Sequence, residues 1–332
     1  MKQTNFTLPT IADVWTAAGR IYPVVSETPI VASPLAAKLS GATSVGLKLE
    51  LLQPTGSFKV RGAANTILSL SDAEKARGVI TFSTGNHGRA VSYVAHQVGV
   101  KAVVCLSKRV PAYRIEAIKE LGGTPVVHGA SQDEAEDHYA VLKEQQGLVP
   151  VVPFDDPRVV AGQGTISLEI LRQNPSVDTL LVPLSGGGLL SGMAMAIKAL
   201  KPSVRVIGIS IVRSPAMLES LKIGRPADIE EKDTLADSLL GGIGRENHVT
   251  MELVKRHVDE HVLVDEQDIE EGMRYLFYQH GLVAEGAASV GLAAILTGKV
   301  DVRGCNVVMP LTGRNVDIAR FLSVIAKGGE TR

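Results

Sequence analysis

The sequence has few of the features that would place a protein in a membrane, in an oxidising compartment or on a nucleic acid. Only two of its 332 residues are cysteines, Cys105 and Cys305, and both lie in apolar runs far apart in the sequence. Buried free thiols in a reducing compartment are therefore favoured over a disulfide. No apolar run approaches the ~20 residues that a membrane helix needs, and the N-terminus lacks a basic-then-apolar signal. With a formal net charge of -1, the chain has no field to attract a nucleic acid or an anionic membrane. We expect a cytoplasmic protein with neither partner.

What the sequence does contain is a strict alternation of short β-branched runs with longer segments of helical period. GVITFS precedes a helical segment that begins near Asn86, and TLLVPL precedes one that begins near Gly188. Strand and helix in turn predict an α/β fold with open, mostly parallel sheets and helices on both faces. The length of 332 residues predicts about two domains.

Four loops have unusual content at the carboxyl ends of expected strands, where open α/β sheets bind their ligands. One places Lys59 at the start of a helix. Another, STGNH, gathers small residues, free amides and side-chain donors that suit a carboxylate. A third contains Gly186, Gly187 and Gly188, whose lack of a Cβ lets backbone amides approach an anion at the positive end of a helix dipole. The fourth is TGRN, residues 312–315. The third loop is thus a candidate phosphate cradle.

Each of these features also has a purely structural interpretation. Lys59 alone would fit a solvated helix face, and glycine runs often form tight turns. Asn86 and His87 alone would fit a helix cap and a packed imidazole. His257 and His261 have the spacing of metal ligands, but no third ligand is evident, so we expect no metal site. The combination favours function, because a phosphate cradle and a lysine at a strand–helix junction are the two anchors that pyridoxal phosphate needs.

These motifs resemble those of the fold-type II pyridoxal-phosphate enzymes, specifically the serine/threonine dehydratase and serine racemase family. The resemblance rests on QPTGSFKVRGA, STGNH, SGGGLLSG and TGRN, and it spans the chain from Thr28 to Asp317. It implies pyridoxal 5'-phosphate as the cofactor and a two-domain fold similar to that of the tryptophan synthase β subunit.

The resemblance also implies roles for individual residues. Lys59 would bind the cofactor covalently and remove the Cα proton of the substrate, for which its amine must be neutral, a state that burial favours. Phe58 would pack beside the cofactor, Asn86 would hydrogen-bond the phenolic oxygen of its ring, and Thr312 would face the pyridine nitrogen. The phosphate would be held by Ser185, Gly186, Gly187, Gly188 and Leu189. The substrate would be held by Ser83, Thr84, Asn86, His87 and Arg314, of which Ser83 and Thr84 would also take part in catalysis.

The reaction implied by the resemblance is the β-elimination of water from a small β-hydroxy amino acid such as threonine or serine, which gives a 2-oxo acid and ammonia. A neutral hydroxyl at Thr312, in place of a carboxylate, makes the cofactor ring a weaker electron sink and so favours elimination over transamination. Three alternatives stay open. The substrate could be 3-hydroxyaspartate or a hydroxyectoine derivative, because residues 238–247 and 281–291 resemble the hydroxyectoine-utilization dehydratases. The chain could instead be an amino-acid racemase, or a non-catalytic Rossmann-type protein that binds a nucleotide.

Three positions depart from the family pattern. Ser210 stands where relatives with an activating divalent cation have a glutamate, so a cation site is not expected. Thr84 stands where the racemase has a serine that acts as acid or base. Arg314 stands where relatives keep a small residue. It either points to solvent or to an internal acid, or it reaches the pocket and favours a substrate with a second carboxylate or a larger body.

The order of the motifs also predicts how the chain divides. Residues 53–151 should form a small, mobile domain on the substrate side, and residues 1–52 and 152–332 should form a large domain that carries the glycine turn and Thr312. Lys59 would lie in the cleft between them. The relatives are dimers, so we expect a homodimer by resemblance.

Overall fold

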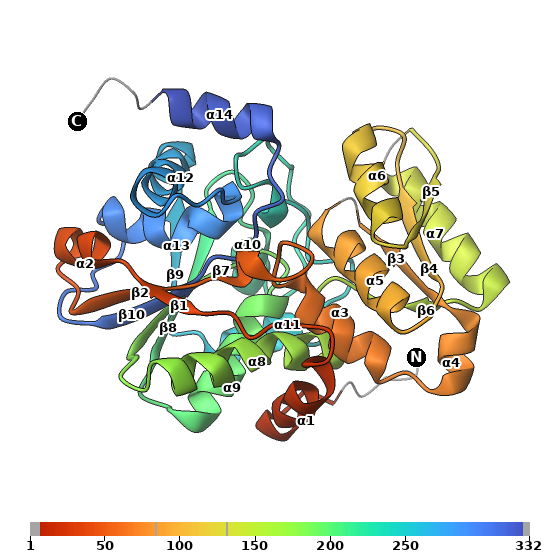
Figure 1. Cartoon of the computed structure of the whole chain (residues 1–332), viewed down its shortest axis with the longest axis horizontal. Helices are drawn as coiled ribbons and strands as arrows, with labels where there is room; N and C mark the ends of the chain where they lie inside the picture. Colours follow the sequence, from red (N-terminus) through yellow and green to blue (C-terminus); the bar gives the residue numbers. More distant parts are fainter. Residues whose placement is uncertain (1–6, 84, 131, 328–332) are drawn as a thin grey trace.

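Two sheets lie beside one another in the computed structural model, each covered by helices (Figure 1). The structure describes residues 7–83, 85–130 and 132–327. Within these ranges the larger sheet has six strands in the order β1-β2-β10-β7-β8-β9, and every neighbouring pair is parallel except β1 with β2. Its strands are β1 (Ile30–Ala32), β2 (Ser44–Lys48), β7 (Thr179–Pro183), β8 (Arg205–Ile211), β9 (Glu260–Val264) and β10 (Asn306–Pro310).

The smaller sheet is built from one continuous part of the chain. Within the described ranges it has four parallel strands in the order β5-β4-β3-β6. Both sheets are open and mostly parallel, so the predicted α/β class is confirmed. All strands of the smaller sheet fall inside the interval 53–151, but the division into domains stays a prediction. The strands are β3 (Val79–Phe82), β4 (Ala102–Leu106), β5 (Thr124–Val127) and β6 (Val149–Pro150).

Helices occupy the connections between strands and cover the sheets on both faces (Figure 1). The α-helices are α1 (Ile11–Ile21), α2 (Pro34–Ser40), α3 (Lys59–Leu68), α4 (Asp72–Arg77), α5 (Asn86–Gln97), α6 (Ala112–Glu120), α7 (Gln132–Gln146), α8 (Pro157–Gln173), α9 (Gly188–Leu200), α10 (Ala216–Ile223), α11 (Thr250–His257), α12 (Glu266–His280), α13 (Gly286–Leu296) and α14 (Ile318–Ala326). Short 3-10 turns form η1 (Glu50–Leu52) and η2 (Asp237–Leu239).

Alternate side chains of β7 point to opposite faces of the sheet and pack into two different hydrophobic cores. Leu181 packs into a core that it shares with α12 and α13, whereas Leu180 and Val182 pack into a core that they share with α8 and α9. Figure 1 shows these helix pairs on opposite sides of the larger sheet. Because both faces are covered, β7 reads as a continuous apolar run, and the loop at its carboxyl end is held by packing on both sides.

The two cysteines differ in their burial. Cys105 lies within β4 and is buried, which raises the pKa of its thiol to about 11. Cys305 is also a free thiol, but it lies in the turn that leads into β10 and is only partly buried. The expectation of two buried thiols is therefore wrong for Cys305, which precedes the first residue of β10 and does not lie within the strand. None of the described helices is long and apolar enough to cross a membrane.

A cluster of buried charges joins β2, η1, α3 and α8. Lys48, Glu50, Arg61 and Glu169 are each at most 1% exposed. Arg61 donates to the Glu50 carboxylate through Nε and Nη2, both at 2.8 Å, and to Glu169 through Nη1 at 2.6 Å. Lys48 Nζ donates to Glu169 at 2.5 Å. Two cations and two anions make the cluster formally neutral, and removing one member would leave a buried charge without its partner. Arg61 follows Lys59 by two residues, so the cluster fixes the first turn of α3.

Replacing Glu169 by glutamine should strongly destabilise the protein, because Arg61 and Lys48 would lose a buried counter-charge. We expect the free energy of unfolding to fall by about 3–5 kcal/mol, measured by urea denaturation at pH 7. Glu252→Gln is the matched control, because Glu252 pairs with Arg256 one turn away on the exposed side of α11. Its substitution should cost about 0.5 kcal/mol or less. Equal effects of the two variants would show that the buried cluster contributes no more than a surface pair.

Candidate active site

Backbone hydrogen bonds join two of the four predicted loops. The turn before α3 runs alongside the loop after β10, with Ser57 paired to Gly313 in an antiparallel bridge. The Phe58 N–H donates to the Thr312 carbonyl at 3.0 Å. Lys59 and Thr312 are therefore brought to the same place, although they lie near opposite ends of the chain.

Lys59 is the first residue of α3, and its side chain is partly buried. Its Nζ atom donates a hydrogen bond to the Pro153 carbonyl at 2.8 Å and lies 5.4 Å from the centroid of the Phe58 ring. Burial lowers the pKa of this amine to about 8. At pH 7 about a tenth of the amines are then neutral, against fewer than roughly one in a thousand at the usual lysine pKa. Lys59 can therefore act as a nucleophile and as a base near neutral pH.

The glycine turn, residues 186–188 between β7 and α9, has no room for side chains. A Cβ on Gly186 would lie 2.5 Å from a ring carbon of Phe154, and one on Gly188 would lie 3.0 Å from the Phe154 Cα atom. Gly187 has a φ of 86°, in the left-handed region that side chains disfavour. The first amides of an α-helix have no partner within the helix and form the positive end of its dipole. The start of α9 therefore presents N–H donors to an anion that can approach the bare backbone closely.

Two consecutive residues connect the lysine to the glycine turn. Pro153 accepts the hydrogen bond from Lys59, and Phe154 packs against Gly186 and Gly188. The amine and the glycine turn are thus neighbours through a single short segment. A third predicted loop therefore lies beside Lys59 and Thr312.

The STGNH loop contributes Asn86, the first residue of α5, which is bound by a buried carboxylate. Its Nδ2 donates to both carboxylate oxygens of Glu285 at 3.0 Å, and its Oδ1 accepts from Asn315 Nδ2 at 2.6 Å. Glu285 is 2% exposed and also accepts from Ser238 Oγ at 2.7 Å and from the Asn315 N–H at 2.8 Å. Burial raises the pKa of Glu285, although the hydrogen bonds from Ser238 and Asn86 oppose that shift.

Sequence reasoning missed Glu285, Asn315 and Ser238 as site residues. All three lie in segments that carried the family resemblance, but nothing in their local pattern indicated a shared contact. The available signal was Glu285 itself, an acidic residue between an apolar segment and the small-residue helix α13. Such a carboxylate is rarely buried without a partner, so its position indicated that several donors surround it.

His87 lies beside Asn86 in α5 and is 3% exposed. Its Nε2 atom is 2.9 Å from the Val151 carbonyl, which places the ring hydrogen on Nε2. Burial and the neighbouring charge of Lys59 lower the His87 pKa to about 3. Its Nδ1 atom, which has no hydrogen-bond partner among the described residues, is then an acceptor. In this state His87 can pack beside a substrate carboxylate but cannot donate to it, and its role there stays a prediction.

The other predicted residues of the STGNH loop are less defined. Ser83 is partly buried, and its Oγ accepts a long hydrogen bond of 3.4 Å from the Gly85 N–H. Thr84 lies outside the described residues. Their roles in binding and catalysis stay predictions.

The remaining predicted residues fall into two groups. Thr312 is 5% exposed, Leu189 in the first turn of α9 is 6% exposed, and Ser185, which precedes the glycine turn, is partly exposed. Arg314 has an exposed side chain, and its N–H donates to the Gly56 carbonyl at 2.9 Å. Exposure favours the interpretation in which the Arg314 guanidinium faces solvent.

No group of three His, Cys, Asp or Glu side chains in the described part of the chain is arranged to bind a metal ion. His257 lies at the end of α11 and His261 in β9, where burial lowers the pKa of each imidazole. Ser210 is 2% exposed near the carboxyl end of β8. A hydroxyl there supplies no negative charge to a divalent cation.

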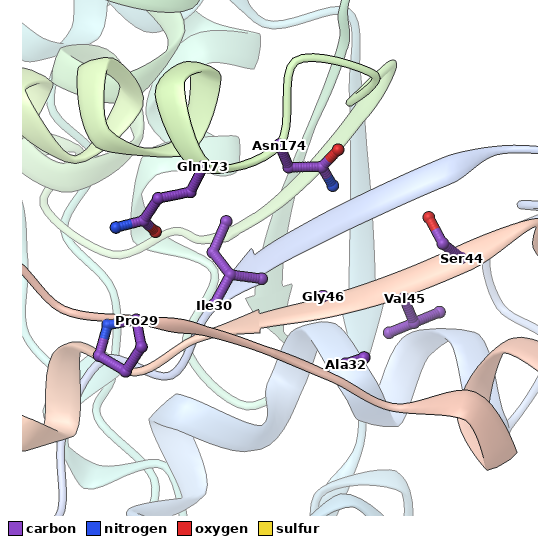
Figure 2. Close-up of a pocket in the computed structure, with 8 residues that line it drawn as sticks. All are labelled: Pro29, Ile30, Ala32, Ser44, Val45, Gly46, Gln173 and Asn174. Atoms are coloured by element: carbon purple, nitrogen blue, oxygen red, sulfur yellow. The ribbon is translucent and has the colours of Figure 1, made fainter.

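A pocket of about 450 Å³ lies elsewhere, at the β1 edge of the larger sheet (Figure 2). None of the predicted site residues lines it, and no ionisable side chain does. It therefore offers none of the acid–base chemistry that the predicted loops bring together. Its lining residues are Pro29, Ile30, Ala32, Ser44, Val45, Gly46, Gln173 and Asn174.

Comparison with known proteins identifies the family that shares this arrangement. Residues 21–313 match the family model described as pyridoxal-phosphate dependent enzyme. The chain belongs to this family. It is 40% identical to the L-threonine ammonia-lyase of Thermotoga maritima, over 96% of this chain and 79% of that protein.

Solved structures of pyridoxal-phosphate enzymes agree with this membership. Maize serine racemase superposes with a TM-score of 0.90 at 31% identity, over 98% of this chain and 99% of that one. The processed form of threonine deaminase isoform 2 from Solanum lycopersicum superposes with a TM-score of 0.89 at 29% identity, over 98% and 92%. The predicted family and its fold are confirmed, whereas the hydroxyectoine-utilization branch stays a prediction.

The site of this pyridoxal-phosphate enzyme fits its cofactor on structural grounds. A primary amine with a pKa near 8 is available for the covalent bond. Side chains are sterically excluded from Gly186 and Gly188, where a phosphate ester needs bare backbone amides. Lys59 would hold the aldehyde carbon, the start of α9 would hold the phosphate, and Thr312 would face the pyridine nitrogen.

The pH dependence of Lys59 reactivity provides a direct check of its surroundings. In the cofactor-free protein, reductive methylation of Lys59 should rise with a midpoint near pH 8, because burial destabilises the ammonium form. The yield at each pH can be measured by peptide mass spectrometry, with the exposed Lys38 as an internal reference for the reagent. A midpoint near 10.4, the value of a solvated lysine, would contradict the described environment.

Proposed function

We propose that this chain is a pyridoxal-phosphate dependent ammonia-lyase that eliminates water from a small β-hydroxy amino acid, with L-threonine and L-serine as the expected substrates. The products are the 2-oxo acid and ammonia. The observation that carries the proposal is the Lys59 amine, which has a lowered pKa and contacts the segment that packs against the glycine turn. Similarity to the threonine ammonia-lyase and the threonine deaminase supports the same reaction class.

The protein groups then have separate tasks. When bound, pyridoxal phosphate supplies the electron sink that stabilises negative charge at the substrate Cα. Lys59 Nζ accepts the Cα proton, which its pKa of about 8 permits at neutral pH. The α9 amides would hold the phosphate, and the neutral hydroxyl of Thr312 would supply no negative charge to the ring nitrogen.

Glu285 orients Asn86 for its proposed bond to the phenolic oxygen of the cofactor. Both carboxylate oxygens lie 3.0 Å from Asn86 Nδ2, so they share one of its two amide hydrogens and leave the other for the cofactor. Asn315 occupies the carbonyl side of the same amide. The Asn86 side chain therefore cannot turn over to present its oxygen instead.

The alternative functions differ in their support. Similarity to maize serine racemase keeps racemisation open, and the position that would decide it, Thr84, lies outside the described residues. The exposed Arg314 favours no particular substrate, so 3-hydroxyaspartate and hydroxyectoine derivatives stay predictions. Membership of the pyridoxal-phosphate family replaces the interpretation as a nucleotide-binding Rossmann protein.

We also propose that residues 53–151 form the mobile, substrate-side domain. Support comes from the contact between α6 and the larger unit, which is polar and loosely filled. Arg114 of α6 pairs with Asp237 of η2 at 2.9 Å, beside a pocket of about 390 Å³. A partly exposed ion pair of this kind is readily broken and remade.

A homodimer in the cytoplasm is the remaining part of the proposal. Its support is apolar surface on α2, α12 and α14. A hydrogen bond between Ser33 and His280 joins the start of α2 to α12, and a hydrogen bond from Tyr278 to the Ile325 carbonyl joins α12 to α14. Several exposed apolar side chains on neighbouring helices form the kind of patch that is typical of a protein interface. They are Leu35, Leu39, Tyr278, Ile318 and Leu322.

The catalytic proposal predicts a coloured protein with lyase activity. Purified protein should absorb in the visible range, borohydride should fix the cofactor on Lys59, and L-threonine or L-serine should release 2-oxo acid and ammonia in equal amounts. Lys59→Ala should lower kcat by roughly 1,000-fold, because it removes the base. Arg314→Gly is the companion variant, since loss of activity on 3-hydroxyaspartate alone would assign Arg314 to a second carboxylate. A colourless protein that stays inactive after cofactor is added would overturn the proposal.

The dimer proposal predicts a sedimentation mass of twice the chain mass of 35.1 kDa. Charges introduced by Leu39→Glu and Leu322→Glu together should shift the protein to the monomer, because both side chains are more than half exposed in the isolated chain. Ile223→Glu, at an equally exposed position on α10, should leave the dimer intact. A monomeric wild-type protein at micromolar concentration would contradict self-association through this surface.

A further inference from the structure

The segment 153–156 contacts both anchors of the proposed cofactor site. Its first residue, Pro153, accepts the hydrogen bond from Lys59 Nζ at 2.8 Å. Its second, Phe154, fills the space in which side chains at Gly186 and Gly188 would stand. The position of this segment therefore sets the separation between the amine and the glycine turn.

Asp155, the third residue of the segment, contacts neither Lys59 nor the glycine turn. Its carboxylate instead caps α11, which lies about 95 residues later in the chain. Its Oδ1 accepts from the N–H groups of Val249 and Thr250 at 2.9 Å, and its Oδ2 accepts from the His248 N–H at 2.8 Å. These amides belong to the start of α11, where a carboxylate satisfies unpaired donors and complements the helix dipole. Hydrogen bonds to a charged acceptor are stronger than neutral ones, so Asp155 ties the segment firmly to α11.

Helix α11 returns to the glycine turn through Thr250. The Thr250 side chain is fully buried, and its Oγ1 donates to the Gly186 carbonyl at 2.8 Å. Asn247 Nδ2 donates to the same hydroxyl at 2.9 Å, and the Gly186 carbonyl is a closer acceptor for the hydroxyl hydrogen than Asn247 Oδ1 at 3.2 Å. A Cβ on Gly187 would lie 3.0 Å from the Thr250 Cβ, so Thr250 also limits the turn by contact.

These contacts close into a ring. It runs from Asp155 to the start of α11, from Thr250 to the Gly186 carbonyl, and from Gly186 back to Phe154, the neighbour of Asp155. One side of the ring is covalent, one is apolar packing, and two are hydrogen bonds. Because Thr250 holds the Gly186 carbonyl, the backbone N–H groups at the start of α9 keep their direction.

We propose that Asp155 is a positioning residue that fixes the glycine turn relative to Lys59 through Thr250, and so determines how tightly the phosphate of the cofactor is held. This inference rests on the proposed function, because it takes the turn to be the phosphate site. It assigns Asp155 no contact with the cofactor or the substrate. Its effect is on affinity for the phosphate group and not on the reactivity of the amine.

The experiment compares two probes that differ only in the phosphate. Pyridoxal 5'-phosphate uses Lys59 and the glycine turn, whereas pyridoxal uses Lys59 alone. Affinities of both for the full-length, cofactor-free protein can be measured by absorbance titration. Asp155→Ala should weaken the binding of pyridoxal 5'-phosphate at least tenfold and change the binding of pyridoxal less than twofold.

Conservative variants should lose less affinity for the phosphate probe, and they keep the test valid if Asp155→Ala does not fold. Asp155→Asn keeps one carbonyl oxygen for Val249 and Thr250 but offers an amide to the His248 N–H, so its loss of affinity should be intermediate. Thr250→Val, which lacks the hydroxyl, should reproduce the phosphate-specific loss, and Thr250→Ser should restore most of the affinity. Asp155→Ala combined with Thr250→Val should be no weaker than the worse single variant, because both break the same ring.

Asp265→Ala is the matched control, because Asp265 caps α12 through the N–H groups of Gln267 and Asp268 and has no part in the ring. It should lower the melting temperature about as much as Asp155→Ala and leave both affinities unchanged. The inference is overturned if Asp155→Ala weakens both probes equally, if it weakens neither, or if Asp265→Ala weakens the phosphate probe as much.

The outcomes separate this inference from the proposed function. A wild-type protein that binds pyridoxal 5'-phosphate but eliminates no water would end the lyase proposal and leave the affinity test intact. A wild-type protein that binds the cofactor no better than pyridoxal would end both.

Discussion

The site depends on keeping a lysine amine out of water beside a turn that has no side chains. Desolvation lowers the pKa of Lys59 to about 8, and the hydrogen bond to the Pro153 carbonyl gives the amine a definite direction. The glycine turn meets the same segment through Phe154. Two consecutive residues thus serve two tasks: Pro153 contacts the amine, and Phe154 contacts the turn.

Two groups of buried polar residues lie near the lysine: one is a neutral cluster of ion pairs, and the other is a single carboxylate surrounded by hydrogen-bond donors. Behind α3, Arg61 and Lys48 are matched by Glu50 and Glu169, so the group is neutral and holds the helix in place. At the start of α5, Glu285 accepts hydrogen bonds from Asn86, Asn315 and Ser238, and burial raises its pKa. The first group gives rigidity, whereas the second aligns polar groups that face the proposed ligand.

The sequence predicted those parts of the structure that leave a local pattern. Alternating strands and helices indicated the sheets, and helices begin at Asn86 and Gly188 as expected. The family resemblance brought Lys59, the glycine turn and Thr312 together. The contacts of Glu285 and Asp155 were not predicted, because each joins residues far apart in the chain, and a hydrogen bond across 199 residues has no signature in either segment. The unprotonated Nδ1 of His87 also depends on a partner, Val151, that only the fold supplies.

The placement of α3 separates the movement that would admit a substrate from the position of the Lys59 amine. This helix packs against α8 in the larger unit and against α5 in the smaller one, and its first turn is anchored by Arg61 to Glu50 and Glu169. If the smaller sheet swings to admit an amino acid, these buried charges hold the start of α3 against α8, so the movement of residues 53–151 begins beyond this first turn. The reactive nitrogen would then keep its position relative to the glycine turn while the smaller sheet moves.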